Sequence, residues 1–127
     1  MAGVLPACEL RLQRIFRLTR SEDFERARRS GRSYPHRLVV LVAHPNDKGC
    51  TRVGVSAGRT VGNAVKRNRA KRLLRAAMQS LVSLVHPGWD VVLIARPPLV
   101  TSNSAEVRGV LVTLLRRADL MAASDAA

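Results

Sequence analysis

The chain has 127 residues, which is enough for one compact domain with a modest core and too few for two. Its net charge is +13, from 19 Arg, 3 Lys and 9 acidic residues, and only four residues are aromatic. Almost half of the residues are apolar, so the chain can bury a core and need not be disordered. The charge favours a polyanionic partner, either a nucleic acid or an anionic membrane surface. The scarcity of aromatic residues argues against modules that stack several bases on aromatic side chains.

Simple patterns exclude several other classes of protein. The longest run without a charged residue, residues 76–89, is 14 residues long, so the sequence predicts no transmembrane helix. Residues 1–13 lack the basic start and the long apolar stretch of a secretory signal. Cys8 and Cys50 have no paired spacing for zinc and are too few for a disulfide framework. We therefore expect a cytoplasmic protein.

The domain organisation is expected to be simple, because the sequence has no internal repeat and no low-complexity block. Residues 1–13 are expected to form a flexible N-terminal segment. Residues 14–121 are expected to form the single domain, and the small residues of 122–127 a disordered tail.

The first predicted elements are a helix and two strands. The helix begins near Thr19–Ser21, with the spacing of a capping box, and ends at Gly31, which suits a left-handed stop. Residues 38–43 are uniformly apolar and predict a strand that is covered on both faces. After turn residues at 45–49, residues 51–57 alternate in character and predict a strand with one face toward the core.

The second half of the chain continues with a helix over 63–78, a buried strand over 91–95 and a last helix. The last helix begins near Asn103 or Ser104 and has apolar residues at helical spacing. Together these elements predict an α+β sandwich of helices on a small sheet.

Positive charge is concentrated on the helix over 63–78. No acidic residue lies between Asp47 and Asp90, whereas nine basic residues do, six of them within residues 66–75. The apolar residues of this helix recur every three or four positions and predict one stripe facing the sheet: Ala70, Leu73, Leu74, Ala77, Met78 and Leu81. The opposite arc carries Asn68, Arg69, Lys71, Arg72 and Arg75, with Arg67 at its border.

This charge pattern is unfavourable for the helix alone. The pairs Arg67–Lys71 and Lys71–Arg75 repel, whereas each opposite-charge pair one turn apart would stabilise a helix by about 0.2–0.5 kcal/mol. Lys66, Arg67 and Arg69 also lie in the first two turns, where the helix dipole disfavours cations. Phosphate groups at this end would remove both conflicts, so the pattern predicts a phosphate-binding face.

The residues just before this helix have two open interpretations. Gly62 permits a left-handed or closely packed backbone, and Asn63 suits the N-cap position. The two residues either only start the helix or also contact RNA. Arg59, slightly upstream, could extend the positive surface.

Three classes of function are weighed from the residues. A plain binding module of the ribosomal RNA type fits the basic helix. A DNA major-groove reader usually has another helix a short turn away, whereas here strands precede the basic helix. A membrane-surface helix would need larger apolar residues than Ala70 and Ala77. His36, His44 and His86 form no metal-binding or catalytic pattern, and no close carboxylate pair suits two-metal chemistry. We expect no catalytic residue and no metal site in this chain.

A long ordered run of residues resembles one known family. The run consists of Val-Gly-Val-Ser at 53–56 and VGNAVKRNRAKRLLR at 61–75, with Arg-Asn-Arg at 67–69. It resembles the protein component of bacterial ribonuclease P. The resemblance covers most of residues 14–118 and includes residues 17–24, 31–33 and 88–97 and the last helix.

The resemblance implies a single-domain α-β-β-β-α-β-α fold, with the basic helix in a left-handed crossover. It implies the accessory protein subunit of a cytoplasmic ribonucleoprotein endoribonuclease that removes the 5′ leader of precursor tRNA. The catalytic centre and its Mg²⁺ would belong to the RNA subunit. The partners would be that catalytic RNA and precursor tRNA, with no membrane and no inferable protein partner.

The resemblance also implies two sets of binding residues. Those that would contact the RNA subunit are Arg59, Asn63, Arg67, Asn68, Arg69 and Arg72. Those that would contact the leader are Phe24, Ser56, Lys71 and Arg75. The protein would screen the repulsion between two RNAs, hold the leader and so raise affinity for precursor over mature tRNA.

Several positions depart from the family's pattern. Where the family has two lysines after a serine, this chain keeps one cation as Arg59 and has Thr60 in place of the other. Positions that carry aromatic residues in the family's leader cleft fall here at Arg28, Val39 and Val42. We therefore expect apolar contact and phosphate attraction in the cleft rather than extensive stacking.

Two further aromatic residues have structural interpretations. Tyr34 is expected to cap the edge of the sheet, with stacking on a leader base as the alternative. Trp89 stands where the family has an aromatic residue before the buried strand, and it is expected to pack against the core.

Overall fold

A computed structural model of the chain describes residues 21–46 and 51–121. Its elements follow the order α-β-β-β-α-β-α, as the resemblance implied. The helices and strands are α2 (Ser21–Ser30), β1 (Arg32–Pro35), β2 (Val39–Pro45), β3 (Arg52–Ser56), α3 (Ala64–Gln79), β4 (Trp89–Ala95) and α4 (Ser104–Arg117). Three short 3-10 helices connect them: η3 (Arg59–Val61), η4 (Val82–Leu84) and η5 (Pro97–Thr101). The expected leader and tail, the Thr19 cap, the turn residues 47–49, Cys8 and Cys50 lie outside the described residues.

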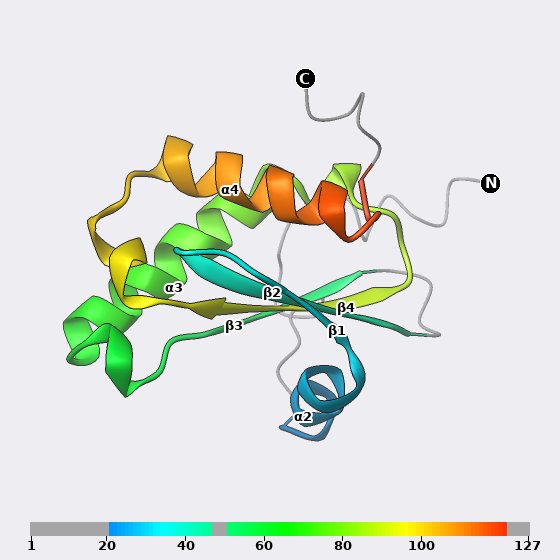
Figure 1. The fold of residues 1–127 in the computed structure, drawn as a ribbon, viewed down its shortest axis with the longest axis horizontal. Helices are drawn as coiled ribbons and strands as arrows, with labels where there is room; N and C mark the ends of the chain where they lie inside the picture. Colours follow the sequence, from blue (N-terminus) through cyan, green and yellow to red (C-terminus); the bar gives the residue numbers. More distant parts are fainter. Residues whose placement is uncertain (1–20, 47–50, 122–127) are drawn as a thin grey trace.

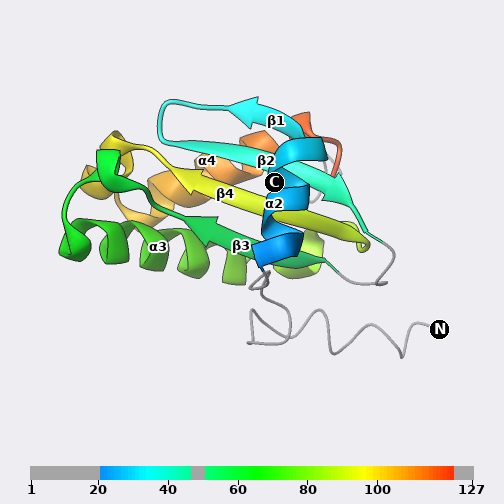
Figure 2. The ribbon, with the colours of Figure 1, turned by 90° about the horizontal axis from the view of Figure 1, so that it is seen from below.

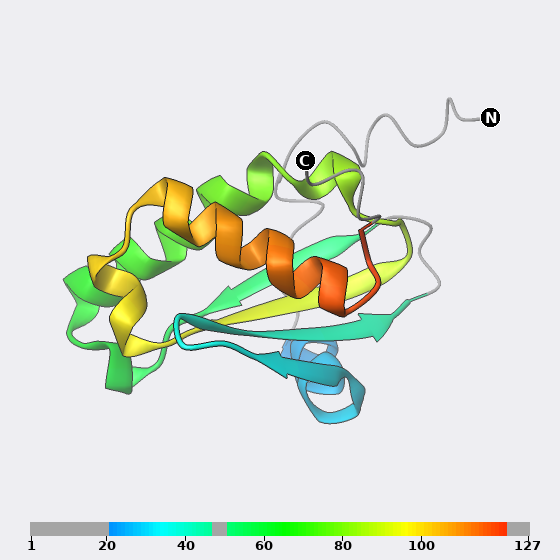
Figure 3. The same ribbon diagram turned by 45° about the horizontal axis from the view of Figure 1, so that its top comes forward.

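The four strands form one mixed sheet in the order β1-β2-β4-β3. β2 is antiparallel to both of its neighbours, whereas β3 and β4 are parallel. The chain passes from β3 to β4 through α3, and this crossover is left-handed, as the views from the two sides of the sheet show (Figures 2 and 3). About 98% of such crossovers are right-handed, so the handedness could be expected only from the family resemblance.

Helices lie on both faces of the sheet (Figure 1). α3 and α4 pack together on one face, and the main core lies between them and the sheet, where residues such as Leu41 and Leu93 are completely buried. α2 crosses the other face and covers a smaller cluster of Ala27, Val42 and Val92. The described part of the chain is therefore the predicted α+β sandwich.

The face of the sheet beneath α2 is only partly covered, which corrects two expectations. Val42 and Val92 are buried under α2, but Val40 and Ile94 on the same face are half-buried. The uniformly apolar strand is thus not fully covered on both sides. Val39 lies on the opposite face, completely buried in the main core, so it cannot line a cleft on the α2 side. Because side chains alternate along a strand, the next residue, Val40, faces the α2 side of the sheet instead.

The predicted helix termini that fall within the described residues agree with the structure, except in the conformation of Gly31. Asn103 caps α4, and its Oδ1 accepts a hydrogen bond from the backbone N–H of Glu106 at 2.8 Å. α2 ends at Ser30 as expected, but Gly31 does not adopt a left-handed conformation. A Cβ at Gly31 would lie 2.5 Å from the carbonyl oxygen of Ala27. Close backbone packing, rather than a left-handed turn, therefore requires the glycine.

The C-terminal end of α4 has an acidic residue in an uncommon conformation. The N–H of Leu120 donates to the carbonyl oxygen of Leu115 at 2.9 Å, and that of Asp119 donates to Arg116 at 3.0 Å, which is the pattern of a Schellman helix end. Asp119 has a φ of 61°, and no other non-glycine residue in the described ranges has a positive φ. Glycine is the usual residue here, and a carboxylate at a helix C-terminus also opposes the helix dipole. Asp119 is therefore an unfavourable choice for the fold alone.

Candidate RNA interface

Helix α3 begins at a glycine–asparagine pair. Gly62 has a φ of 141°, which other residues rarely adopt, and a Cβ there would lie 2.6 Å from the side chain of Lys66. Asn63 is the N-cap, and its Oδ1 accepts a hydrogen bond from the backbone N–H of Lys66 at 3.0 Å. The predicted helix start is confirmed, and the first turn contains no acidic residue.

α3 separates its apolar and cationic residues as the sequence predicts. The buried stripe consists of Ala70, Leu74, Ala77 and Met78, with Leu73 half-buried and Leu81 buried just after the helix. The solvent side presents exposed polar residues that we call the basic arc: Lys66, Asn68, Arg69 and Arg72, preceded by the exposed Arg59 in η3. The arc therefore joins most of the residues predicted to contact the RNA subunit into one surface.

One border of α3 faces η5 and α4. The Nε of Arg69 donates a hydrogen bond to the carbonyl oxygen of Val100 in η5 at 3.0 Å. Farther along the same border, the Nε of Arg108 in α4 donates to the hydroxyl of Ser80 at 3.2 Å. Arg69 thus has a structural contact in addition to its place in the basic arc.

The opposite border of α3 faces away from α4 and toward β3, which is an edge strand (Figure 2). Arg67, Lys71 and Arg75 follow one another at intervals of four residues along this border. All three are half-buried, so Lys71 and Arg75 lie at the edge of the basic arc rather than across it as the sequence predicted. The Nε of Arg67 is buried and has no hydrogen-bond partner within the described ranges. A buried donor without an acceptor lowers the stability of the fold by about 1–3 kcal/mol. An acceptor that reaches this guanidinium would therefore bind favourably.

A row of residues crosses the partly open face of the sheet on the side of α2. Val40, Ile94 and Ser56 are register partners across β2, β4 and β3, and all three are half-buried. Ser56 was predicted from the resemblance, whereas Val40 and Ile94 were not singled out. The period-two alternation of strand residues could have identified Val40, once the buried face was known. Phe24 lies in α2 on this side of the sheet, and its side chain is outside the described part.

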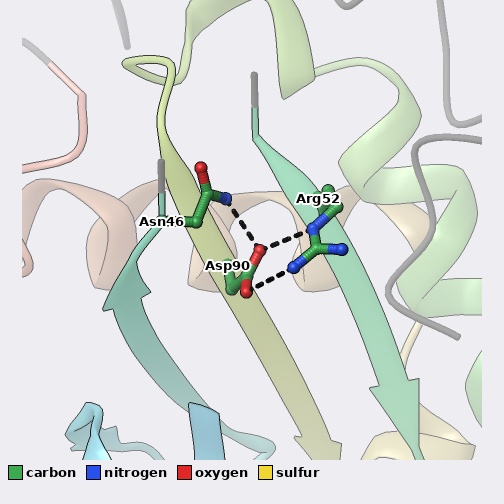
Figure 4. Close-up of polar contacts among 3 residues, drawn as sticks. All are labelled: Asn46, Arg52 and Asp90. Carbon is green, nitrogen blue, oxygen red and sulfur yellow. Dashed lines mark hydrogen bonds and ion pairs between the residues drawn. The ribbon is translucent and has the colours of Figure 1, made fainter. Parts of the chain in front are cut away.

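An ion pair that the sequence analysis missed lies on the same face of the sheet, at the other end of these strands (Figure 4). Arg52 in β3 donates through Nε and a terminal nitrogen to the two carboxylate oxygens of Asp90 in β4, at 2.9 and 2.8 Å. The amide nitrogen of Asn46, just after β2, donates to the same carboxylate at 2.8 Å. The side chains of Arg52 and Asp90 are only 15% and 4% exposed. The pair therefore fastens β3 to β4 and to the end of β2.

The described residues contain no group of three or more His, Cys, Asp or Glu side chains that could hold a metal ion. Tyr34 lies in the edge strand β1, and both Tyr34 and Trp89 pack against the main core while remaining half-buried. None of the described helices is both long enough and apolar enough to cross a membrane.

Comparisons with known proteins agree with one another. The family model of Ribonuclease P matches residues 12–119. The ribonuclease P protein component of Dehalococcoides mccartyi is 39% identical over 109 residues, covering 86% of this chain and 89% of the relative. That of a Roseiflexus species is 35% identical over 115 residues, covering 90% of this chain and 94% of the relative. Among solved structures, the Staphylococcus aureus RNase P protein matches with a TM-score of 0.75 at 28% identity, covering 84% of this chain and 98% of the other. The Thermotoga maritima RNase P protein matches with a TM-score of 0.72 at 28% identity, covering 80% and 96%.

Proposed function

The chain belongs to the family of ribonuclease P protein components, and we propose that it assists 5′ maturation of tRNA through two RNA-binding surfaces. One surface binds the catalytic RNA subunit and the other binds the 5′ leader of precursor tRNA. The observation that carries this proposal is the basic arc, whose cations occupy a helix start without any acid to offset them. RNA phosphates supply the missing negative charge.

The surface for the RNA subunit consists of the basic arc together with Asn63 and Arg67. The amide oxygen of Asn63 accepts a bond within the helix, so its contact with RNA would come from the amide nitrogen. Arg67 has a buried donor without a partner in the described part, and a phosphate acceptor would satisfy that donor if the side chain turned outward. These residues would position the protein on the RNA without reading its bases.

The surface for the leader lies where the β3 border of α3 meets the open face of the sheet. Lys71 and Arg75 supply charge along the border, and Ser56 supplies a hydroxyl. Val40 and Ile94 supply apolar contact in place of aromatic rings, and Phe24 in α2 is assigned to the same surface from the resemblance. The leader is then held by phosphate attraction and apolar contact, with little stacking.

We assign the cleavage chemistry and its Mg²⁺ ions to the RNA subunit, on the basis of the family resemblance. The donor groups of the described residues do not fit a metal ion held by the protein alone. The chain would supply cations between two RNAs, which lowers their mutual repulsion and so reduces the need for screening by Mg²⁺. We place this ribonucleoprotein in the cytoplasm.

The test of this function is cleavage of precursor tRNA by the RNA subunit from the same source, with and without this protein. At low Mg²⁺ concentration we expect the protein to raise the cleavage rate, and at high Mg²⁺ we expect the difference to shrink. The reason is that the protein's cations and the metal ions screen the same repulsion. An unchanged rate at every Mg²⁺ concentration would rule out the proposed function.

The leader surface is tested by the double substitution Lys71→Ala/Arg75→Ala. Two partly exposed charge contacts of about 1 kcal/mol each correspond to a loss of roughly thirtyfold in affinity for precursor tRNA. Binding of mature tRNA, which has no leader, is expected to stay the same, and so is assembly with the RNA subunit. The measurement is equilibrium binding of both tRNAs to the assembled complex. Equal weakening for precursor and mature tRNA would move these residues out of the leader surface.

A further inference from the structure

A cavity of about 440 Å³ lies on the α4 side of the sheet, beneath the C-terminal end of α4. It is formed by strands β1, β2 and β4, the last residue of α2 and the residues that terminate α4, and it contains none of the residues assigned above to RNA. Its volume is within the range of about 300–1,000 Å³ that is usual for small-molecule sites. Four larger side chains line it among small residues: Arg32, Tyr34, Trp89 and Asp119.

The aromatic lining is notable in a chain with only four aromatic residues. Tyr34 is in β1 and Trp89 is in β4, the two strands on either side of β2, and both residues line this cavity and are half-buried. A partly exposed aromatic side chain at a cavity offers a flat surface on which a nucleobase can stack. Trp89 was expected to pack against the core, and Tyr34 to cap the sheet edge or to stack on a leader base. Their shared place at this cavity, on the α4 side of the sheet, is an additional feature.

Asp119 adds a carboxylate to the same cavity. The fold alone would favour glycine at this left-handed position, and the helix dipole disfavours an acid there. Asp119 is exposed, and no salt bridge joins it to a cation in the described part of the chain. An ionised carboxylate accepts hydrogen bonds through two oxygens, so it matches a ligand with two adjacent N–H donors.

Among the four bases of RNA, only guanine presents two such donors side by side, at N1 and at the exocyclic N2. Uracil has one donor on that edge, and the amino groups of adenine and cytosine stand beside acceptors, which a carboxylate repels. Arg32 is exposed at the same cavity and supplies a cation for the phosphate attached to the base.

We propose that this cavity binds a guanine nucleotide, with the base between the aromatic side chains and Asp119 and the phosphate at Arg32. This site goes beyond the proposed function, because it lies outside both RNA-binding surfaces. The nucleotide is either free or an unpaired guanosine within an RNA, and the base and its phosphate are common to both.

The single Trp of the chain allows a direct test, because the 127-residue chain gives one indole N–H signal in its NMR spectrum and Trp89 lines the cavity. The protein without RNA is titrated separately with GMP, AMP, CMP and UMP. A second pair of titrations uses two short single-stranded RNAs that are identical except at one position, where one RNA has guanine and the other has adenine. We expect the indole signal to shift to saturation with the guanine ligand. The concentration that gives half of this shift should be at least tenfold lower than for the ligands without guanine. If GMP binds as tightly as the guanine RNA, the ligand is the free nucleotide, and tighter binding of the RNA identifies an unpaired guanosine.

The Asp119→Asn variant separates recognition from folding. Asn tolerates the left-handed conformation and removes the conflict with the helix dipole, so its melting temperature should be unchanged or higher. Its affinity for the guanine ligand should fall roughly tenfold, since a bidentate contact to a base is lost. Glu106→Gln is the matched control, because it removes an exposed acid near the other end of α4, and its affinity should not change.

The proposal is overturned if no ligand shifts the indole signal, if the four nucleotides act equally, or if Asp119→Asn binds like the original protein. None of these results bears on precursor tRNA cleavage, and a failure in that cleavage assay would leave this binding result standing.

Discussion

Reversing both charges in the double variant Arg67→Glu/Arg69→Glu is expected to abolish assembly with the RNA subunit. Each arginine that contacts phosphate contributes about 2 kcal/mol as a charge-assisted hydrogen bond, so the loss is roughly a thousandfold in affinity at physiological salt. Repulsion between the new carboxylates and the phosphates adds to this loss. The measurement is filter binding of labelled RNA subunit.

The controls must separate charge from folding, because the Nε of Arg69 also donates to Val100. Arg37→Glu/Arg117→Glu changes the net charge equally, at exposed positions outside both proposed surfaces, and is expected to bind nearly as well as the original protein. Arg67→Lys/Arg69→Lys keeps the charge and should retain most of the affinity. Unchanged binding by the double Glu variant, with intact circular dichroism, would show that this face does not bind the RNA subunit.

The salt dependence of binding gives an independent check on the same surface. About six phosphate contacts predict a slope of roughly −4 to −5 in a plot of log affinity against log salt. Loss of two contacts should make the slope shallower by roughly 1.5. A slope near zero for the original protein would contradict an electrostatic interface.

The second large effect is expected from Asp90→Ala, and it concerns stability. The substitution removes the shared acceptor of Arg52 and Asn46 and leaves a guanidinium that is only 15% exposed without its carboxylate. Breaking a buried pair by removing one partner costs about 3 kcal/mol or more. For a domain of this size, that loss lowers the melting temperature by roughly 12–20 °C.

Urea unfolding followed by circular dichroism measures this loss for Asp90→Ala. Arg52→Lys is the comparison variant, because it keeps the charge but loses the two-pronged contact, and about 1 kcal/mol is expected for it. A loss below about 1 kcal/mol for Asp90→Ala would show that the ion pair does not fasten the strands.

The basic helix could be predicted from sequence because its signals are local. The apolar spacing of Ala70, Leu74 and Met78 defined the buried side, and the cap at Asn63 defined the start. The two borders were harder to assign, because exposure there depends on neighbours in space. Lys71 and Arg75 are half-buried since their border faces the sheet edge, which no pattern within the helix reveals.

Features that depend on strand register could not be predicted from the residues. The ion pair of Asp90 could not be predicted, because its partner Arg52 is 38 positions away and becomes adjacent only through the parallel pairing of β3 and β4. Val39 and Val40 are chemically equal in the sequence, and only the position of α2 distinguishes the faces that they occupy. β1 was not predicted from its own residues, because a short, largely exposed edge strand has no hydrophobic alternation to reveal it.

During synthesis on the ribosome, the sheet cannot be completed until residues 89–95 have emerged, because β4 lies between β2 and β3. Until then β3 has no strand beside it, although α3 has already been made. At about 5–20 residues per second, translation of residues 57–88 takes roughly 2–6 s. In the last part of that interval, after residue 79 has been added, the nascent chain carries all the cations of α3 before β4, the strand that completes the sheet, exists.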